Sequence, residues 1–323
     1  MDLRNRPELK NSARTALSGA AYDPKKLILI HTAASAGILL LLSVINYVLN
    51  QQISGTGGLG GIGLRSVLST AQSVLQLVQL FVLPFWEMGI LFVALKIARQ
   101  ESVAPASLLQ GFRRWGSLLR AMILQGIVYM GLAFIALYFG VQLFMFTPAA
   151  TELMELLTPY MSDSTALQGG IALDEATAAA ITKAYIPALI ICGVLYAVAL
   201  VPITYWFRMT NYILLDEPKV GAFTAMRLSR VMMRYNCFDL FKLDLSFWWY
   251  YLLQLVLAVI CYGDVIVKVL NISLPWSQDI SFFLFYILSL MGQVVLFYFT
   301  RNQVEVTYAL AYESIRPRKA GEE

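Results

Sequence analysis

The sequence predicts an all-α polytopic membrane protein with six transmembrane helices. Of its 323 residues, 59% are hydrophobic and only 14% are charged, whereas about one-quarter of the residues in soluble domains are charged. The apolar residues come in runs of about 18 residues or more, long enough to cross a hydrocarbon core of about 30 Å. The Lys and Arg residues gather between alternate runs. The composition excludes collagen, coiled-coil and disulfide-scaffold classes.

Each expected span is an apolar run between polar or charged segments. The first run has 24 residues without a charged side chain, and at a helical rise of about 1.5 Å per residue it is about 36 Å long. The second run is longer and contains Pro84 and Glu87. In chain order, the six expected spans are residues 27–50, 65–96, 121–146, 184–207, 246–263 and 281–300.

The distribution of basic residues predicts the orientation. Of the 24 Lys and Arg residues, 21 lie on one side of the expected bilayer, in the N-terminal tail, residues 96–120, residues 208–245 and a tail that starts at Arg301. Only Arg65, Lys183 and Lys268 lie on the other side. Because loops rich in Lys and Arg stay in the cytoplasm, both termini are expected to be cytoplasmic.

The six spans are expected to form three hairpins within a single membrane domain, residues 1–323. The units are 1–102 with the N-terminal tail, 103–217 with an outer loop at 147–183, and 218–323 with the C-terminal tail. Each unit begins with a similar basic, amphipathic cytoplasmic segment, which indicates a weak internal repeat. Within the outer loop, helices are expected at 151–161 and 174–183, the second with Asp174 as its N-cap.

The basic cytoplasmic segments form a candidate surface for lipid or for a partner. Arg227, Arg230 and Arg234 share one face at helical spacing, and Arg113 and Arg114 precede the third span. We favour a role in which these helices orient the spans and contact the phospholipid headgroups of an anionic inner leaflet. The alternative is a docking surface for a membrane or cytoplasmic protein partner. Nothing in the sequence indicates a nucleic acid as partner.

No motif in the sequence indicates a catalytic residue, a cofactor or a metal site. The lone His31 is expected to be hydrogen-bonded near the cytoplasmic interface. Residues 58–63 match Gly-x-Gly-x-x-Gly but connect two spans rather than a strand and a helix, so we expect a flexible connection. Cys192, Cys237 and Cys261 lack metal or redox spacing. Free thiols are favoured, although a disulfide between Cys192 and Cys261 also fits the topology.

A polar stripe in the second span is the strongest candidate for a polar interior. Its members follow helical spacing along one face, and Glu87 lies about 14 Å from the expected helix end at Lys96. A central charge costs about 2.5–3.5 kcal/mol, so Glu87 is expected to face protein or water, or to be protonated. Pro84 could kink the helix beside it. The stripe comprises Gln72, Gln76, Gln79 and Glu87, and the amides of Gln125, Gln254 and Gln293 could converge on it.

Two interpretations of the stripe remain open. The residues either line the proton- or cation-sensitive interior of a transporter, or form interhelical hydrogen bonds that hold the bundle together. We favour the second interpretation, because glutamines commonly bind helices to one another and the stripe contains a single acid.

The chain also resembles a known family along one stretch. The similarity rests on Asp216-Glu217-Pro218, on Ala225-Met226-Arg227-Leu228-Ser229-Arg230 and on Leu240-Phe241-Lys242-Leu243-Asp244-Leu245. Further elements are Gly89, Leu109-Gln110-Gly111-Phe112 and Val201-Pro202. These residues resemble the bacterial membrane family called domain of unknown function 975, over about residues 85–260. The resemblance implies a multi-pass protein of the bacterial cytoplasmic membrane and assigns no activity.

The leading functional hypothesis is a non-catalytic accessory or scaffold component. It rests on the missing catalytic constellations together with the basic interfacial segments. The alternative is a small transporter or lipid-handling protein with a polar interior around Glu87. A lipid-modifying enzyme ranks third, because the acids Glu101, Asp216 and Asp244 near the inner interface lack a recognisable nucleophile or metal set.

Overall fold

The computed structural model describes residues 3–55, 62–162, 175–269 and 278–317, and every regular element in these ranges is helical. The helices are α1 (Arg6–Ser18), α2 (Pro24–Gly55), α3 (Ile62–Ala98), η2 (Pro105–Leu109), α4 (Gln110–Arg113), α5 (Trp115–Phe144), α6 (Pro148–Ser162), α8 (Glu175–Phe207), α9 (Thr210–Asp216), α10 (Ala222–Met233), α11 (Cys237–Leu245), α12 (Trp248–Cys261), α13 (Gly263–Val269), α14 (Gln278–Leu296), the π-helical turn η3 (Phe297–Arg301) and α15 (Asn302–Ile315).

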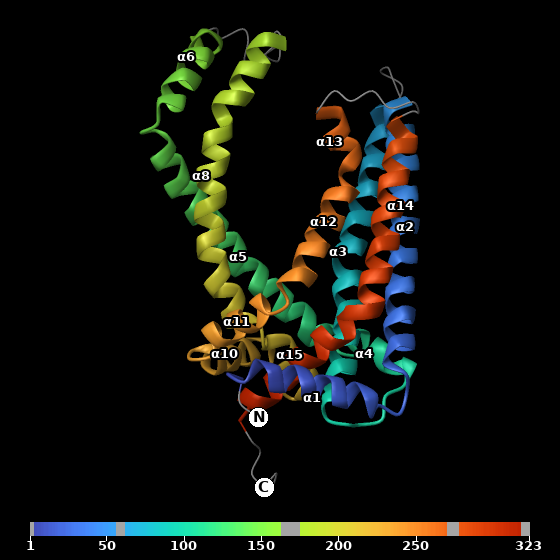
Figure 1. Ribbon diagram of the computed structural model, residues 1–323. Coiled ribbons are helices and arrows are strands. Elements are labelled where there is room, and N and C mark those ends of the chain that lie inside the picture. Colours follow the sequence, from blue (N-terminus) through green and yellow to red (C-terminus); the bar gives the residue numbers. More distant parts are fainter. Residues whose placement is uncertain (1–2, 56–61, 163–174, 270–277, 318–323) are drawn as a thin grey trace.

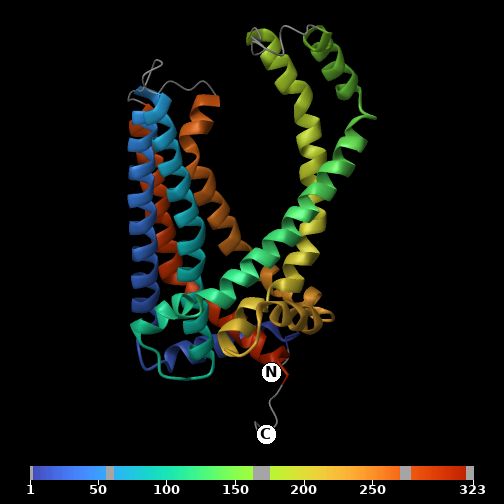
Figure 2. The ribbon, with the colours of Figure 1, turned by 180° about the vertical axis from the view of Figure 1, so that it is seen from behind.

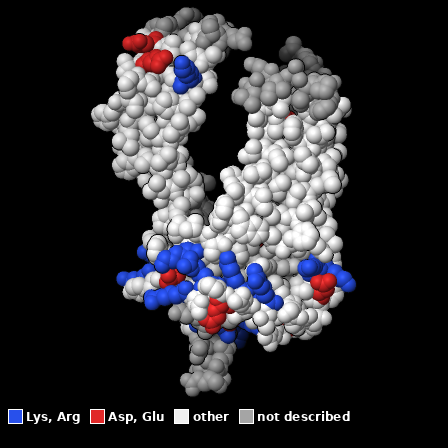
Figure 3. All heavy atoms as spheres, viewed as in Figure 1, with Lys and Arg blue, Asp and Glu red and all other residues white. Residues whose placement is uncertain are grey.

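Two helical arms rise from a common base (Figure 1). One arm contains α5, α6 and α8, and the other contains α2, α3, α12, α13 and α14. The shorter helices α1, α4, α9, α10, α11 and α15 form the base, where both chain ends lie (Figures 1 and 2). Lys and Arg residues gather around this base, whereas the sides of the arms are nearly free of charge (Figure 3). The gap between the arms is open between side chains as well as between ribbons (Figure 3).

Five helical segments are long and apolar enough to cross a membrane. They are Pro24–Ile53, Gly63–Ala98, Trp115–Phe144, Thr177–Asp216 and Ile280–Ile315. These segments correspond to the first, second, third, fourth and sixth expected spans, and the third ends at Phe144 rather than at residue 146. Few of their residues are buried against other parts of the protein. In the most apolar stretch of the fourth segment, only 6% of the residues are buried. Such long, exposed apolar helices define an integral membrane protein.

The fifth expected span, 246–263, is shorter and bent in the structure. Its helix α12 has 14 residues, which at about 1.5 Å per residue reach only about 21 Å. The preceding helix α11 meets α12 at an angle of 67°, and the two pass the length and composition criteria only as a pair. The segment therefore counts as a sixth span only if this bent pair is taken as one unit.

The C-terminal region differs from the expectation of a polar tail beginning at Arg301. The chain continues without a break from α14 through η3 into α15, which ends at Ile315. Val304, Tyr308 and Tyr312 repeat every four residues and are buried, so they form one face of α15. This face packs in the base, where α15 lies against α1 and α3.

The core of the protein lies in the base rather than in the arms. The N-terminal helix α1 buries Leu9, Ala13 and Ala16, and packs on α15. The same hydrophobic cluster includes Ile90 of α3 and Leu240 of α11. Residues far apart in sequence thus form one apolar core that joins the feet of both arms.

Two glycines allow the backbones of α3 and the segment 105–113 to touch. A Cβ atom on Gly89 would lie 2.7 Å from the carbonyl carbon of Leu108 and closer still to its oxygen. A Cβ atom on Gly111 would lie 2.9 Å from the carbonyl carbon of Phe85. Only glycine leaves room for this reciprocal contact, which fixes η2 and α4 against the part of α3 that carries Glu87.

The arm that contains α5 ends in the segment predicted as an outer loop. Both expected helices are found there, the first as α6 and the second as the start of α8. A small second cluster joins them through Phe144, Ala150 and Ala188. The expected N-cap Asp174 and residues 58–61 of the glycine-rich motif lie outside the described residues.

Candidate functional site

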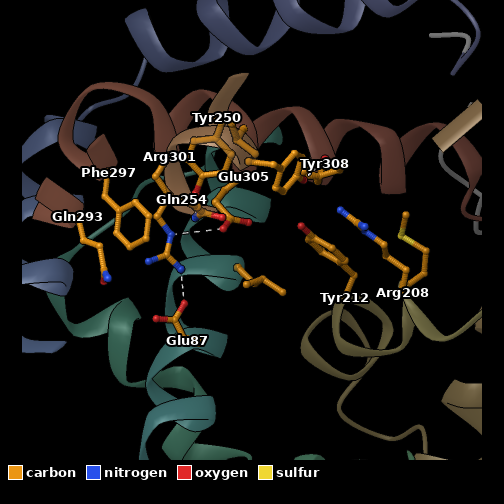
Figure 4. Close-up of a pocket in the computed structure, with 14 residues that line it drawn as sticks. Glu87, Arg208, Tyr212, Tyr250, Gln254, Gln293, Phe297, Arg301, Glu305 and Tyr308 are labelled. Atoms are coloured by element: carbon orange, nitrogen blue, oxygen red, sulfur yellow. Dashed lines mark hydrogen bonds and ion pairs between the residues drawn. The ribbon is translucent and has the colours of Figure 1, made fainter. Parts of the chain in front are cut away.

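A cavity of about 500 Å³ lies where the lower ends of the two arms meet. It is formed where α3, α12 and α14 meet η3, α15 and the link between α8 and α9 (Figure 4). Its wall combines charged, amide and aromatic side chains with a few apolar ones. The lining residues are Glu87, Leu91, Arg208, Met209, Tyr212, Tyr250, Tyr251, Gln254, Gln293, Phe297, Arg301, Val304, Glu305 and Tyr308.

One side of the cavity is built around Arg301, which is paired with two carboxylates. Its guanidinium forms an ion pair with Glu87 of α3, and its Nε lies 3.4 Å from Oε1 of Glu305, one helical turn further along (Figure 4). The ring of Phe297 covers the guanidinium at 4.6 Å from the ring centroid. The side chain of Arg301 is only 8% exposed, whereas that of Glu87 is 39% exposed. The cation is therefore covered, and Glu87 is the more exposed member of the pair.

Arg208 and Asp244 form a second ion pair beside the cavity. The guanidinium donates from Nη1 to Oδ2 at 2.9 Å and from Nη2 to Oδ1 at 3.1 Å. The hydroxyl groups of Tyr205 and Tyr308 also donate to this carboxylate, and Tyr308 shares a hydrogen bond of 2.6 Å with Tyr251. Since the network joins α8, α11, α12 and α15, it ties the foot of one arm to the other.

The structure brings three of the seven predicted interior residues to the cavity. These are Glu87, Gln254 and Gln293. Gln254 donates to the hydroxyl of Tyr250 at 2.9 Å, and Gln293 donates to Ser289 Oγ at 3.4 Å.

The other four predicted interior residues lie elsewhere. Gln72 donates to Asn50 Oδ1 at 3.0 Å and so joins α3 to α2. Gln76 is exposed, Gln79 is half-buried, and neither lines the cavity. Gln125 lies on α5 in the opposite arm. Helical spacing aligned the stripe with Glu87, but Gln72 lies 15 residues away in sequence, or about 22 Å along the axis. Residues on the same face of α3 therefore need not line the same cavity.

Sequence reasoning missed most of the charged residues at the cavity. The sequence predicts Arg301 at the start of a tail and Asp244 as an acid near the inner interface, and it indicates no role for Glu305. Arg301 and Glu305 lie four residues apart in a segment that also contains Val304 and Tyr308 at helical spacing. This spacing is the signal that could have marked a buried ion pair on a helix.

The predicted basic surface is exposed except for one member. Arg227 and Arg230 are exposed on α10, Arg234 is exposed directly after it, and Arg113 is exposed on α4. The opposite face of α10 is buried. Arg114 instead turns inward and donates to the carbonyl oxygens of Leu214, at 2.8 Å, and Leu215. Burial lowers the pKa of its guanidinium. Arg114 therefore satisfies the last carbonyls of α9 and is not part of the free surface.

His31 and the cysteines occupy structural positions. His31 is buried and stacks on Trp86, with ring centroids 5.1 Å apart. Its Nε2 lies 3.2 Å from the Trp86 carbonyl, and the Trp86 indole donates to the His31 carbonyl at 3.1 Å. This confirms the expected hydrogen-bonded histidine. The three cysteines are free thiols, with Cys192 on α8 and Cys261 on α12 in opposite arms.

Metal ligation finds no support among the described residues. No group of three or more His, Cys, Asp or Glu side chains within the described ranges is placed to hold a metal ion. The charged groups of the cavity are instead arranged as ion pairs and tyrosine hydrogen bonds.

The fold and the cavity define a class: a helical integral membrane protein with a charged cavity between two arms. Comparison with known families gives a more specific assignment. The chain belongs to the family described as "Protein of unknown function (DUF975)", which matches residues 1–319. The match confirms the resemblance seen in the sequence and extends well beyond residues 85–260. No curated protein and no solved structure matches the chain.

Proposed function

We propose that this protein binds an amphiphilic lipid, with the polar headgroup in the cavity and the apolar chain between the arms. The observation that carries the proposal is the position of the cavity, at the foot of an open gap whose walls are membrane-spanning helices. Its volume of about 500 Å³ is within the usual range of about 300–1,000 Å³ for small-molecule sites. A molecule with one polar and one apolar end fits both surfaces at once.

The two ion pairs support different roles, and this difference favours binding over simple structural support. Asp244 is surrounded by Arg208 and tyrosine hydroxyls, as expected for a network that joins helices. Glu87 has Arg301 on one side and remains 39% exposed on the other. A charge held in a membrane protein and left accessible is a candidate for ligand contact. The proposal thus adopts the lipid-handling alternative around Glu87, without a catalytic step.

The topology that accompanies this function has six spans in three hairpins. Consecutive long helices pack side by side as α2 with α3, α5 with α8 and α12 with α14, which supports this arrangement. The base of the molecule, which is rich in Lys and Arg, would lie at the cytoplasmic face of a bacterial cytoplasmic membrane, with both termini inside. Labelling of single cysteines placed at Ser18 and at Glu152 tests this topology in intact cells. Glu152→Cys should react with an impermeant maleimide, and Ser18→Cys only after permeabilisation.

The exposed basic face of α10 favours a second, compatible role at the inner membrane surface. Arg227, Arg230 and Arg234 point away from the protein core, and a polybasic surface attracts anionic headgroups by about 1 kcal/mol per residue. An accessory role through a protein partner would use the same face. Reversing these three charges should release either kind of contact while leaving the thermal unfolding of the protein unchanged.

Blocking the cavity tests the proposed lipid binding. Wild-type protein purified in mild detergent is expected to retain a lipid in native mass spectrometry. Gln293→Trp and Leu91→Trp place a large ring in the cavity wall and should remove that lipid. Gln76→Trp is the matched control, because Gln76 is exposed and lies outside the cavity. Equal retention in the cavity variants and the control would refute the proposal.

A further inference from the structure

The cavity and the ion pair beside it contain one more carboxylate than guanidinium groups. Its charged lining residues are Glu87, Glu305, Arg208 and Arg301, and Arg208 is held by Asp244 through two hydrogen bonds. When all five groups are ionised, three carboxylates face two guanidinium groups, which leaves one negative charge. In a region of low dielectric, one uncompensated charge has a larger effect on ligand choice than it has in water.

In the pair that Arg301 forms with Glu87, the more exposed member is the negative one. Arg301 is covered by Phe297 and by its two carboxylate partners. The cationic member of the pair is 8% exposed and the anionic member, Glu87, is 39% exposed. An anionic headgroup that entered from the gap would meet the Glu87 carboxylate before it reached Arg301, and like charges repel.

Aromatic rings form much of the remaining wall of the cavity. Tyr212, Tyr250, Tyr251, Phe297 and Tyr308 all line the cavity. Among the described residues, cations lie over the rings of Phe297 and Tyr308, and no Lys or Arg is placed over Tyr250 or Tyr251. Aromatic faces attract ammonium groups, with about 0.5–2 kcal/mol gained per contact, and recur in sites for quaternary amines.

We infer that the headgroup bound in this cavity carries a cationic amine, held by the Glu87 carboxylate and the surrounding aromatic rings. The inference deepens the proposed lipid-binding function and rests on it. It selects aminated amphiphiles, with a primary or quaternary ammonium group, over lipids whose headgroup is only anionic or only a neutral sugar. Glu305 and Arg301 position Glu87, and the amides of Gln254 and Gln293 are placed to accept or donate hydrogen bonds at the cavity wall.

Three probes with the same apolar chain test the inference: decyltrimethylammonium, decyl phosphate and decyl maltoside. Binding is measured by calorimetry with wild-type protein in nanodiscs of uncharged lipid, and only the binding lost in Gln293→Trp or Leu91→Trp is counted. This subtraction removes adsorption to the basic face of α10. Decyltrimethylammonium is expected to bind about tenfold more tightly than decyl phosphate, with the maltoside between them.

The role of Glu87 is tested by Glu87→Gln, in which Arg301 keeps Glu305 as a partner. This variant should bind decyltrimethylammonium about tenfold more weakly and decyl maltoside within about twofold of wild type. Glu152→Gln, an exposed glutamate on α6, is the matched control and should change neither. If Glu87→Gln does not fold, the ranking of probes on wild-type protein decides.

The outcomes separate the inference from the proposed function. Tighter cavity binding of decyl phosphate or of the maltoside would overturn the amine assignment while supporting lipid binding. An unchanged ammonium affinity in folded Glu87→Gln would also overturn it. If none of the three probes binds in the cavity, the inference and the proposed function both fail.

Discussion

Alanine in place of Gly89 or Gly111 is expected to destabilise the base strongly. The added Cβ would lie 2.7 Å from the carbonyl carbon of Leu108 in the first variant and 2.9 Å from that of Phe85 in the second. Carbon atoms pack at about 3.5–4.0 Å, so the two backbones must separate by about 0.6–0.8 Å or more. Overpacking costs about 1–3 kcal/mol, and we expect about 3 kcal/mol because both obstacles are main chain.

Thermal unfolding in a fixed detergent measures this loss. Gly126→Ala is the matched control, since a Cβ on Gly126 in α5 meets nothing within 4 Å. That substitution should be neutral or stabilise by up to about 1 kcal/mol, because alanine favours helix. The double variant at Gly89 and Gly111 should lose less than the sum of the two single variants, because one backbone separation relieves both overlaps. Losses for Gly89→Ala within about 0.5 kcal/mol of the control would refute the proposed backbone contact.

Three other substitutions test the polar contacts of the base. Arg301→Leu leaves two carboxylates without their cation and should reduce stability by about 3–5 kcal/mol; a loss below about 1 kcal/mol in chemical unfolding would contradict the buried pairing. Arg114→Leu leaves two carbonyls of α9 without a donor and should cost about 1–3 kcal/mol, whereas the exposed Arg113→Leu should change stability by less than about 0.5 kcal/mol. Asp244→Asn should lower the melting temperature far more than Asp239→Asn, whose ion pairs at 3.5–3.6 Å lie nearer the surface, and similar shifts would count against the network at Arg208.

The helical membrane class could be predicted because it depends on composition and run length alone. Apolar runs long enough to cross a bilayer can satisfy their backbone hydrogen bonds in few ways, so five of the expected spans correspond to long helices. The fifth expected span is the exception, because α12 is too short to cross a membrane alone. Residues 246–263 are apolar enough to cross, but a bend of 67° between α11 and α12 is a tertiary feature that hydropathy does not report.

The cavity was only partly predictable, since its residues come from distant parts of the chain. Glu87 could be identified because a charged residue in an apolar run is costly. Its partner Arg301 was hidden by the assumption that charge marks the end of a span. The pairing of residues 214 positions apart depends on how α15 packs against α3. A single sequence contains no direct record of that packing. The four glutamines outside the cavity show the same limit of helical periodicity.

The π-helical turn η3 sets the rotational phase between α14 and α15. An α-helix advances by about 100° per residue, so the single wider turn offsets every later side chain relative to an uninterrupted α-helix. Upstream of η3, Gln293 faces the cavity; downstream, α15 presents its apolar face to α1 and α3. If Phe297–Arg301 were wound as an α-helix with no residue removed, α15 would rotate by about 100° relative to α14. Glu305 and Tyr308 would then turn away from the cavity that they line.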